Sequence, residues 1–367
     1  MMVEVKGKKT TFNDIVNKIG FPTIFIGGFW VLLLIAGGAL GISVITLLSD
    51  TIKRAGMNGI LVLAMVPSIQ SGTGPNFALP VGIVCGLFAL VCSIEFGFTG
   101  WAWLFVAIAF AIPLAAFVGY LYGRLLNAVK GSEMTIATYT GFSIVAAMCL
   151  AWLMIPFKSP NMGWFIGKGL RETIQLDAIG GAQILSNFLR FSLFAEEGLI
   201  AVNSETGIII PTGMLLLFLI CCTIVWLYFR SKSGIAISAG GINPKFAQSS
   251  GINIDRCRIK ANVLSTILAA IGIIVYSQGY GYAQLYTAPL MMAFAAVAAV
   301  LIGGASAQRA RVSHVIIGVL IYQGLFTTAL PVANQLFEGT DLSEILRMII
   351  QNGIILYALT KVKGGDN

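Results

Sequence analysis

The sequence has few charged residues for its length. Only 10% of its 367 residues are Asp, Glu, Lys or Arg, whereas 57% are hydrophobic. A soluble domain carries about 25% charged residues, so a chain this poor in charge cannot cover a surface that faces water. The composition therefore predicts an all-α integral membrane protein.

Motifs that bind nucleotides or perform catalysis are also missing. The sequence has no G-x-x-x-x-G-K-[ST] loop, no H-E-x-x-H and no G-x-S-x-G. The nearest glycine string, 163–169, has the wrong spacing for a phosphate-binding loop. The single histidine, His314, cannot form a metal cluster with six cysteines that show no C-x-x-C spacing. We therefore expect no enzymatic activity, no metal and no cofactor on this chain.

Ionisable residues are nearly absent from the centres of the apolar runs, and Glu95 lies near the end of one. Carriers that couple transport to protons or sodium often place Asp, Glu or His inside the bilayer. This absence argues against a proton-coupled secondary transporter. The lack of an ionised anchor favours a neutral polar solute.

The apolar runs themselves are long, and a spanning helix needs about 20 mostly apolar residues. We predict about ten transmembrane helices within a permease domain, 21–367, that follows a hydrophilic segment, 1–20. The helices are expected at 21–38, 57–71, 76–96, 101–126, 134–156, 208–229, 259–279, 286–303, 312–335 and 342–360. A linker with Asp50, Lys53 and Arg54 is expected at 39–56, and a longer polar insert at 157–206.

The positive charges predict the orientation. Six Lys or Arg residues lie in the 230–260 loop against Asp255 alone, and the segments before 21, around 130, around 310 and after 360 are also basic. Because Lys and Arg concentrate in cytoplasmic loops, both termini are expected in the cytoplasm and the 157–206 insert outside. Lys53 and Arg54 are exceptions, since they fall on the outer side. The net charge of +8 has this topological explanation, so we expect no nucleic-acid partner.

The outer insert contains a possible helix at 185–194. Its apolar residues Leu185, Phe188, Leu189 and Phe191 could form one stripe. The pattern fits either an amphipathic helix on the membrane surface or an ordinary packed helix of the insert.

Two segments interrupt the apolar pattern in a similar way. Each of 70–80 and 277–289 has a Gln, a Gly-x-Gly and then a Pro that opens the next apolar run. Irregular backbone at membrane depth is tolerated where it packs in protein or lines a water-filled cavity. Matching breaks in two halves suggest an internal repeat with the translocation pathway between the repeats. The alternative is two unrelated glycine turns. The candidate pathway residues are Gln70, Asn76, Gln278 and Gln284.

The basic loop 230–260 has the punctuation of a short helix. Asn243 is a good N-cap and Pro244 suits the first helical position. Gly251 fits the left-handed position after the helix, and a second helix can start near Asn253. The pattern predicts a short capped helix that another protein could grip, although a plain topogenic loop is the alternative.

The loop also resembles a known family. The matching residues of the 234–254 stretch are Ala239, Gly241, Asn243, Pro244, Ala247, Ser250, Gly251 and Ile252. This pattern is similar to the cytoplasmic signature of ribose/galactose-type ABC permeases, and 300–306 resembles a second motif of that family. The resemblance covers about 57–335, but Asn76-Phe-Ala departs from the family pattern, and the loop also looks like that of nucleoside and purine permeases.

The resemblance implies a type II-like ABC importer permease with an internal inverted repeat, in a bacterial cytoplasmic membrane. Its expected partners are a cytoplasmic ATP-binding subunit, an extracytoplasmic solute-binding protein, a second permease that is identical or paralogous, and membrane lipid. The ATPase is expected to dock on the loop through Gly241, Asn243, Pro244, Lys245, Ala247, Ser250, Gly251 and Ile252. The expected solute is a ribose- or galactose-like sugar. The alternatives are a nucleoside, purine or vitamin permease, a stand-alone carrier or channel, and a membrane-anchored structural or signalling protein.

Overall fold

The computed structural model describes residues 21–163, 169–195, 198–202, 207–286 and 289–336, with a few positions between 345 and 356. Within this part, seven helices are long and apolar enough to span a membrane, and two shorter apolar helices lie at Leu79–Glu95 and Pro289–Ile302. Together they correspond to the first nine predicted helices. Most of the tenth, 342–360, and the N-terminal segment lie outside the described residues.

The elements follow one another along the chain with short connections. The helices are α2 (Phe21–Ala39), α3 (Val44–Leu63), α4 (Met65–Gln70), α5 (Leu79–Glu95), α6 (Gly100–Ala128), α7 (Glu133–Met154), α8 (Ile184–Asn187), α9 (Thr212–Arg230), α10 (Lys232–Ile242), α11 (Pro244–Ser249), α12 (Ile254–Tyr280), α13 (Pro289–Ile302) and α14 (Val312–Leu336). The strands are β1 (Thr173–Gln175), β2 (Phe191–Ala195), β3 (Gly198–Val202), β4 (Ile208–Ile210) and β5 (Tyr282–Gln284).

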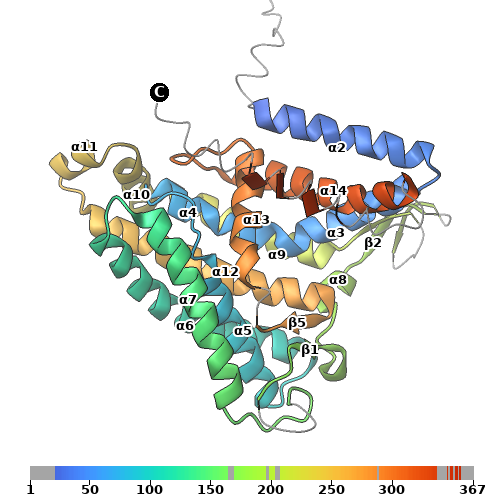
Figure 1. Ribbon diagram of the computed structural model, residues 1–367, viewed down its shortest axis with the longest axis horizontal. Helices are drawn as coiled ribbons and strands as arrows, with labels where there is room; N and C mark the ends of the chain where they lie inside the picture. Colours follow the sequence, from blue (N-terminus) through green and yellow to red (C-terminus); the bar gives the residue numbers. More distant parts are fainter. Residues whose placement is uncertain are drawn as a thin grey trace, which may run out of the picture.

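Helix α12 lies at the centre of the bundle. It packs against α5 and α6 on one side and against α3 on another, while α14 packs against α2, α3 and α13. Figure 1 shows α2, α3 and α14 side by side along one edge, with α5, α6 and α7 grouped along the other. The buried residues of α12, α5 and α3 join one apolar core.

The two ends of the bundle differ. Helices α10 and α11 lie at one end, which we call the α11 end, and the strands lie at the opposite end, the strand end (Figure 1). At the strand end β1 pairs antiparallel with β5, and β2 lies between β3 and β4. The strand pair β1–β5 therefore ties the 157–206 insert directly to the segment that follows α12.

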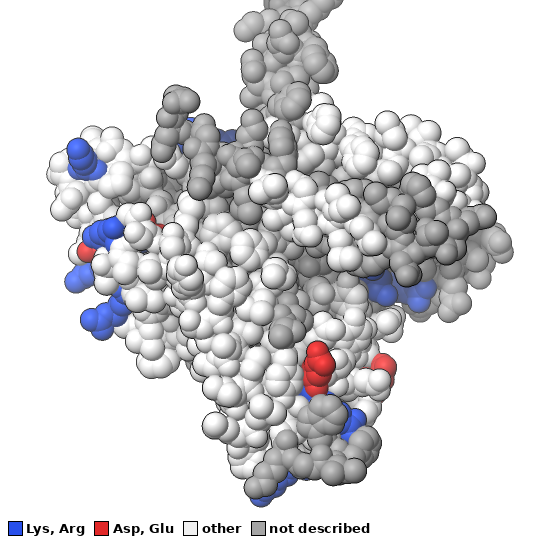
Figure 2. All heavy atoms as spheres, viewed as in Figure 1, with Lys and Arg blue, Asp and Glu red and all other residues white. Residues whose placement is uncertain are grey.

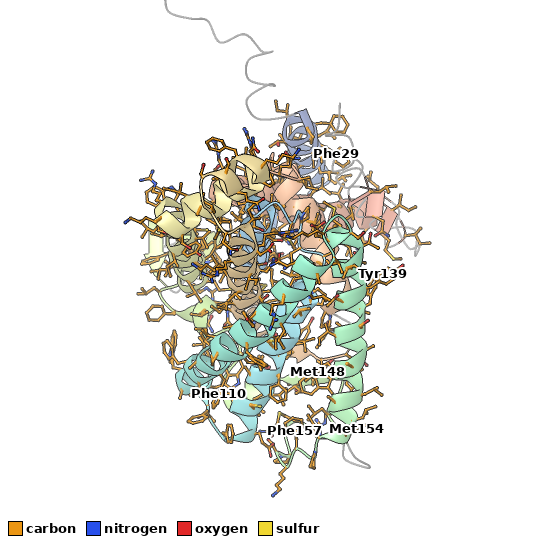
Figure 3. All side chains as sticks on the ribbon, turned by 90° about the vertical axis from the view of Figure 1, so that its left-hand side faces the viewer. Phe29, Phe110, Tyr139, Met148, Met154 and Phe157 are labelled. Carbon is orange, nitrogen blue, oxygen red and sulfur yellow. The ribbon has the colours of Figure 1, made fainter. Side chains whose placement is uncertain are left out.

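The outside of the bundle is apolar between these ends. Figure 3 shows Phe29, Phe110 and Tyr139 on the outer faces of α2, α6 and α7, and all three are exposed. In Figure 2 Lys and Arg gather at the α11 end, and a broad uncharged band separates them from the charges of the strand end. This distribution is that of a protein whose middle faces lipid.

The two predicted breaks are present, at opposite ends of the bundle. The first lies between Gln70 at the end of α4 and Leu79 at the start of α5, and it contains Gly72 and Gly74 with positive φ. The second follows α12, where Gly281 has φ +85°. The first touches α10 and the second includes β5, so the helices that precede them, α3 and α12, run in opposite directions. An inverted repeat requires this arrangement.

The predicted linker at 39–56 is wrong. Residues 44–63 form one helix, α3, which Ser43 caps by accepting a hydrogen bond from the Thr46 amide. Charges at 50, 53 and 54 lowered the apolar score of the segment, but tertiary packing against α14 stabilises the helix. Lys53 and Arg54 therefore lie on a membrane-spanning helix.

The predicted helix at 185–194 is also wrong, in either of its two interpretations. Only Ile184–Asn187 is helical, Leu189 has a φ of +50°, and β2 begins at Phe191. The left-handed residue ends the helical turn, and pairing with β3 and β4 on both sides holds the following residues extended.

Candidate functional site

Helix α11 projects from the bundle as a short capped helix, as the sequence predicts. The Asn243 side chain accepts a hydrogen bond from the Phe246 amide at 3.1 Å, and Pro244 occupies the first turn. After the helix, Gly251 has φ +81°, in the left-handed region that favours glycine. Asn253 then caps α12 by accepting from the Arg256 amide at 3.0 Å. Two caps and one glycine thus fix both ends of α11.

The outer surface of α11 is free of other described elements. Lys245, Ser250 and Gly251 are exposed, and the Phe246 ring is 66% exposed, whereas Ala247 is buried against the loop. Gly241 and Ile252 are half-buried at the base. A large aromatic ring at the tip of a polar, basic loop is typical of a surface that another protein covers.

The base of this loop contacts the first break. A Cβ atom on Gly241 would lie 2.2 Å from the Gln70 carbonyl oxygen, so α10 and the end of α4 touch backbone to backbone. The Gln70 amide spans the contact: its Oε1 accepts from the Ser238 hydroxyl at 2.6 Å, and its Nε2 donates to the Ala310 carbonyl at 2.6 Å. Movement of α10 would therefore displace the 70–80 break.

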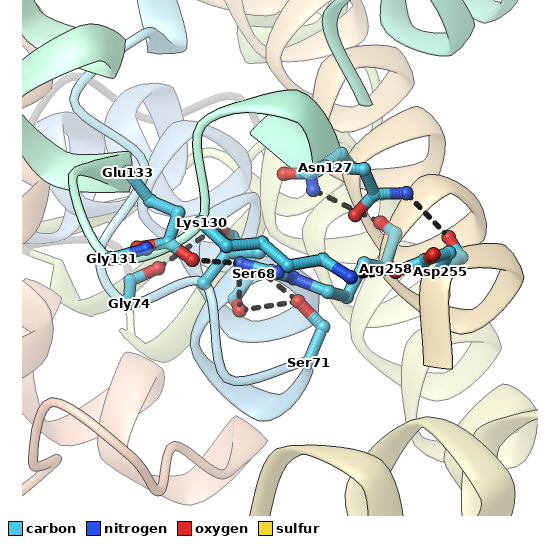
Figure 4. A network of polar contacts seen from close by, with 11 residues as sticks. Ser68, Ser71, Gly74, Asn127, Lys130, Gly131, Glu133, Asp255 and Arg258 are labelled. Carbon is cyan, nitrogen blue, oxygen red and sulfur yellow. Dashed lines mark hydrogen bonds and ion pairs between the residues drawn. The ribbon is translucent and has the colours of Figure 1, made fainter. Parts of the chain in front are cut away.

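A second set of polar contacts joins α12 to the turn between α6 and α7 (Figure 4). Arg258 forms an ion pair with Glu133, and Lys130 Nζ lies 2.6 Å from Asp255 Oδ1. Asn127 donates to the Asp255 carbonyl at 2.9 Å. These contacts connect the start of α12, directly after α11, to the start of α7.

A cavity of about 640 Å³ lies between these parts at the α11 end. Its walls include Gly72 of the first break, Glu133 of α7, Gln248 of α11 and Arg258 of α12. The docking loop, the break and the α6–α7 turn therefore meet around one space.

Three of the four predicted pathway residues hold elements together. The Asn76 amide donates to Ser265 on α12 at 2.9 Å and its Oδ1 accepts from the Tyr122 hydroxyl on α6. Gln278 is fully buried, and its Oε1 accepts from the Leu185 amide of the insert at 3.1 Å. Gln70, described above, is the third.

Gln284, the fourth, borders a separate cavity of about 320 Å³. We call it the α3 cavity, since α3 provides Arg54 and Asn58. Its other walls come from α12, α13 and α14. The remaining lining residues are Leu61, Val62, Tyr276, Tyr280, Met291, Met292, Ala295, Ala296, Tyr322, Gln323 and Phe326.

Sequence reasoning missed all lining residues of this cavity except Gln284. The available signal was the misfit of Lys53 and Arg54 with the positive-inside rule, because a cation at the wrong side of a loop can instead be a cation inside a helix. The aromatic and amide residues from 276 to 326 gave no pattern of their own, since folding alone brings them together.

A bundle of membrane-spanning helices with a capped, exposed cytoplasm-type loop defines a multi-pass membrane permease. Residues 47–359 match the family model described as branched-chain amino acid transport system / permease component. The match covers most of the chain, and the chain belongs to this family of ABC transporter permeases.

Several characterised permeases are similar to this chain. The galactofuranose transporter permease protein of Escherichia coli strain K12 is 25% identical over 92% of this chain and 87% of its own. The xylose transport system permease protein of the same strain is 24% identical over 70% of this chain and 71% of its own. The nucleoside ABC transporter permease protein of Lactococcus lactis subsp. cremoris is 24% identical over 53% of this chain and 51% of its own.

Proposed function

We propose that this chain is the permease subunit of an ATP-driven importer for a sugar, a ribose- or galactose-like monosaccharide. The similarity to galactofuranose and xylose permeases over most of the chain supports this solute class. A nucleoside, purine or vitamin is the second candidate, supported for nucleosides by a shorter match to a nucleoside permease. A stand-alone carrier would have no use for an exposed loop built like α10–α11.

We propose further that α11 is the site at which a cytoplasmic ATPase docks. In this arrangement the α11 end lies in the cytoplasm with both termini, and the strand end faces outside, where a solute-binding protein delivers its cargo. The chain itself hydrolyses no ATP. The observation that carries the proposal is the backbone contact between Gly241 and the first break, because it links an exposed helix to the inside of the bundle.

The proposed mechanism follows from that contact. Closure of two ATPase subunits would push the α11 helices of two permeases, and α10 would pass the displacement to Gln70 and Gly72. The ion pair between Arg258 and Glu133 would carry α7 with α12 as one body. Rigid-body movement of this kind switches a pathway between outward and inward access. The second permease is either identical or paralogous.

The test of this function is the substitution Gly251→Val. No atom lies within 4 Å of the added Cβ, so the substitution strains only the local backbone, whose φ is +81°. We expect α11 to lose its fixed end, and ATP hydrolysis to continue with at least about a tenfold loss of solute uptake, measured in proteoliposomes with the complete importer.

The matched control is Gly97→Val at the strand end. Gly97 has φ +77° and open space around its Cβ, so it carries the same strain away from α11. Uptake per ATP should stay near that of the unaltered importer. If Gly251→Val also leaves coupling intact, α11 does not dock the ATPase. Thermal-shift screening of the partner binding protein against sugars, nucleosides and vitamins would identify the solute class.

A further inference from the structure

Arg54 lies inside the membrane-spanning part of the chain, at the α3 cavity. It is half-buried about 15 Å from the first residue of α3, at 1.5 Å per residue. A cation at such depth is costly and marks a substrate or ion pathway in membrane proteins. The positive-inside rule does not explain it either, since the rule concerns loops.

The guanidinium has aromatic neighbours and no anion among the residues that the structure describes. It lies 5.9 Å from the ring centroid of Tyr280 and 5.6 Å from that of Phe326. The described ion pairs do not include it, although Asp50 lies one turn away on the same helix. Rings on two sides hold the group in place and leave its N–H donors available.

The other cation buried within a membrane-spanning helix is treated differently. Arg258 on α12 faces the Glu133 carboxylate, which compensates its charge. Arg54 has an amide-rich cavity in place of such a carboxylate. Because a desolvated cation is stabilised by an opposite charge, the missing partner of Arg54 is an anionic group that enters the cavity.

The rest of the cavity fits a small polar body. Its volume of about 320 Å³ lies at the lower end of the range for small-molecule sites, about 300–1,000 Å³. Asn58, Gln284 and Gln323 provide amide groups from α3, β5 and α14, and Tyr276 and Tyr280 provide ring faces and hydroxyls. Amides and hydroxyls can both donate to and accept from sugar hydroxyls.

We infer that the α3 cavity binds a sugar-sized polyhydroxy solute that carries a carboxylate or a phosphate, and that Arg54 pairs with this anionic group. The inference rests on the proposed import function and names the substrate class for it. It replaces the expectation of a neutral solute, which depended on placing Arg54 in a loop outside the membrane.

The experiment compares acidic sugars with their neutral counterparts on the full chain in lipid nanodiscs. Binding of radiolabelled D-galacturonate, D-galactose, D-ribose 5-phosphate and D-ribose is measured by scintillation proximity. We expect at least one acid to bind 10-fold or more tightly than its neutral counterpart. Preference for galacturonate over galactose identifies a carboxylate, and preference for ribose 5-phosphate over ribose identifies a phosphate.

Variants show whether Arg54 is responsible. Arg54→Gln should abolish the preference, and Arg54→Lys should retain part of it, because an ammonium keeps the charge without the bidentate geometry. Lys53→Gln is the matched control, since Lys53 is the neighbouring cation on α3 and does not line the cavity. Its preference should equal that of the unaltered chain.

Several outcomes would overturn the inference. They are equal binding of acidic and neutral sugars, binding of neither acid, and a preference that survives Arg54→Gln. None of them affects the importer proposal, which is tested by coupling to the ATPase at α11. Conversely, intact coupling in Gly251→Val would refute the docking role of α11 and leave the acid preference measured here unchanged.

Discussion

At the scale of single residues, the charges of this chain divide by depth. Lys130 and Asp255 pair at the surface, where each side chain is more than half exposed, at 53% and 54%. Arg258 and Glu133 pair in the interior, where the side chains are only 8% and 17% exposed. Exposed pairs contribute about 0–1 kcal/mol, whereas breaking a buried pair costs about 3–5 kcal/mol because one charge stays unpaired.

We therefore predict that Glu133→Gln destabilises the protein far more than Asp255→Asn. The first should lower the unfolding free energy by about 3 kcal/mol, since the Arg258 guanidinium stays buried without its carboxylate. The second should cost less than about 1 kcal/mol. Thermal unfolding in detergent measures both. The double variant Glu133→Gln/Arg258→Met should recover much of the loss, and a loss equal to that of Glu133→Gln alone would contradict a pairwise effect.

At the scale of elements, glycines decide how closely the central helices approach. The two G-x-x-x-G pairs of the sequence, 82/86 on α5 and 119/123 on α6, both face α12. A Cβ atom on Gly86 would lie 2.4 Å from the Ala270 carbonyl oxygen, and one on Gly82 would lie 2.5 Å from that of Thr266. Small residues at such spacing allow backbones to pack tightly in membranes.

We predict that Gly86→Ala lowers stability by about 1–3 kcal/mol, because the added methyl group must push α5 away from α12. Gly28→Ala on α2 is the control, since nothing lies within 4 Å of its Cβ. It should be neutral or stabilising by up to about 1 kcal/mol, the helix propensity difference between the two residues. Equal melting temperatures for the two variants would show that the α5–α12 contact can relax.

The sequence predicted these elements where local chemistry decides them. Nine apolar runs became helices, and Asn243, Pro244 and Gly251 mark α11 because capping depends only on neighbouring residues. It failed where distant contacts decide. Arg54 made 39–56 read as a loop, and Phe191 joined a helical stripe although β3 and β4 hold it in a strand. The α3 cavity depends on four elements at once, so no local pattern predicts it.

At the scale of the whole molecule, the proposed import cycle connects three places along one line. Helix α11 lies beyond the bundle, the 70–80 break touches its base, and the α3 cavity lies further in, toward the strand end (Figure 1). Helix α3 joins the last two, since it carries Arg54 and leads into α4 and the break. A push on α11 would therefore reach the cavity through one continuous path of backbone.

The first step of that path depends on Phe246, which is 66% exposed and contributes little to the fold. If the ATPase buries this ring, Phe246→Ala removes an interface anchor, and anchors of this kind contribute about 2 kcal/mol or more, about a thirtyfold loss of affinity. Co-purification with the ATPase in mild detergent should fall accordingly, while acid-sugar binding at the α3 cavity stays unchanged. Phe117→Ala is the matched control, because its ring is 63% exposed on the lipid-facing side of α6. Retention of the ATPase by Phe246→Ala at the level of Phe117→Ala would place the docking surface elsewhere than the tip of α11.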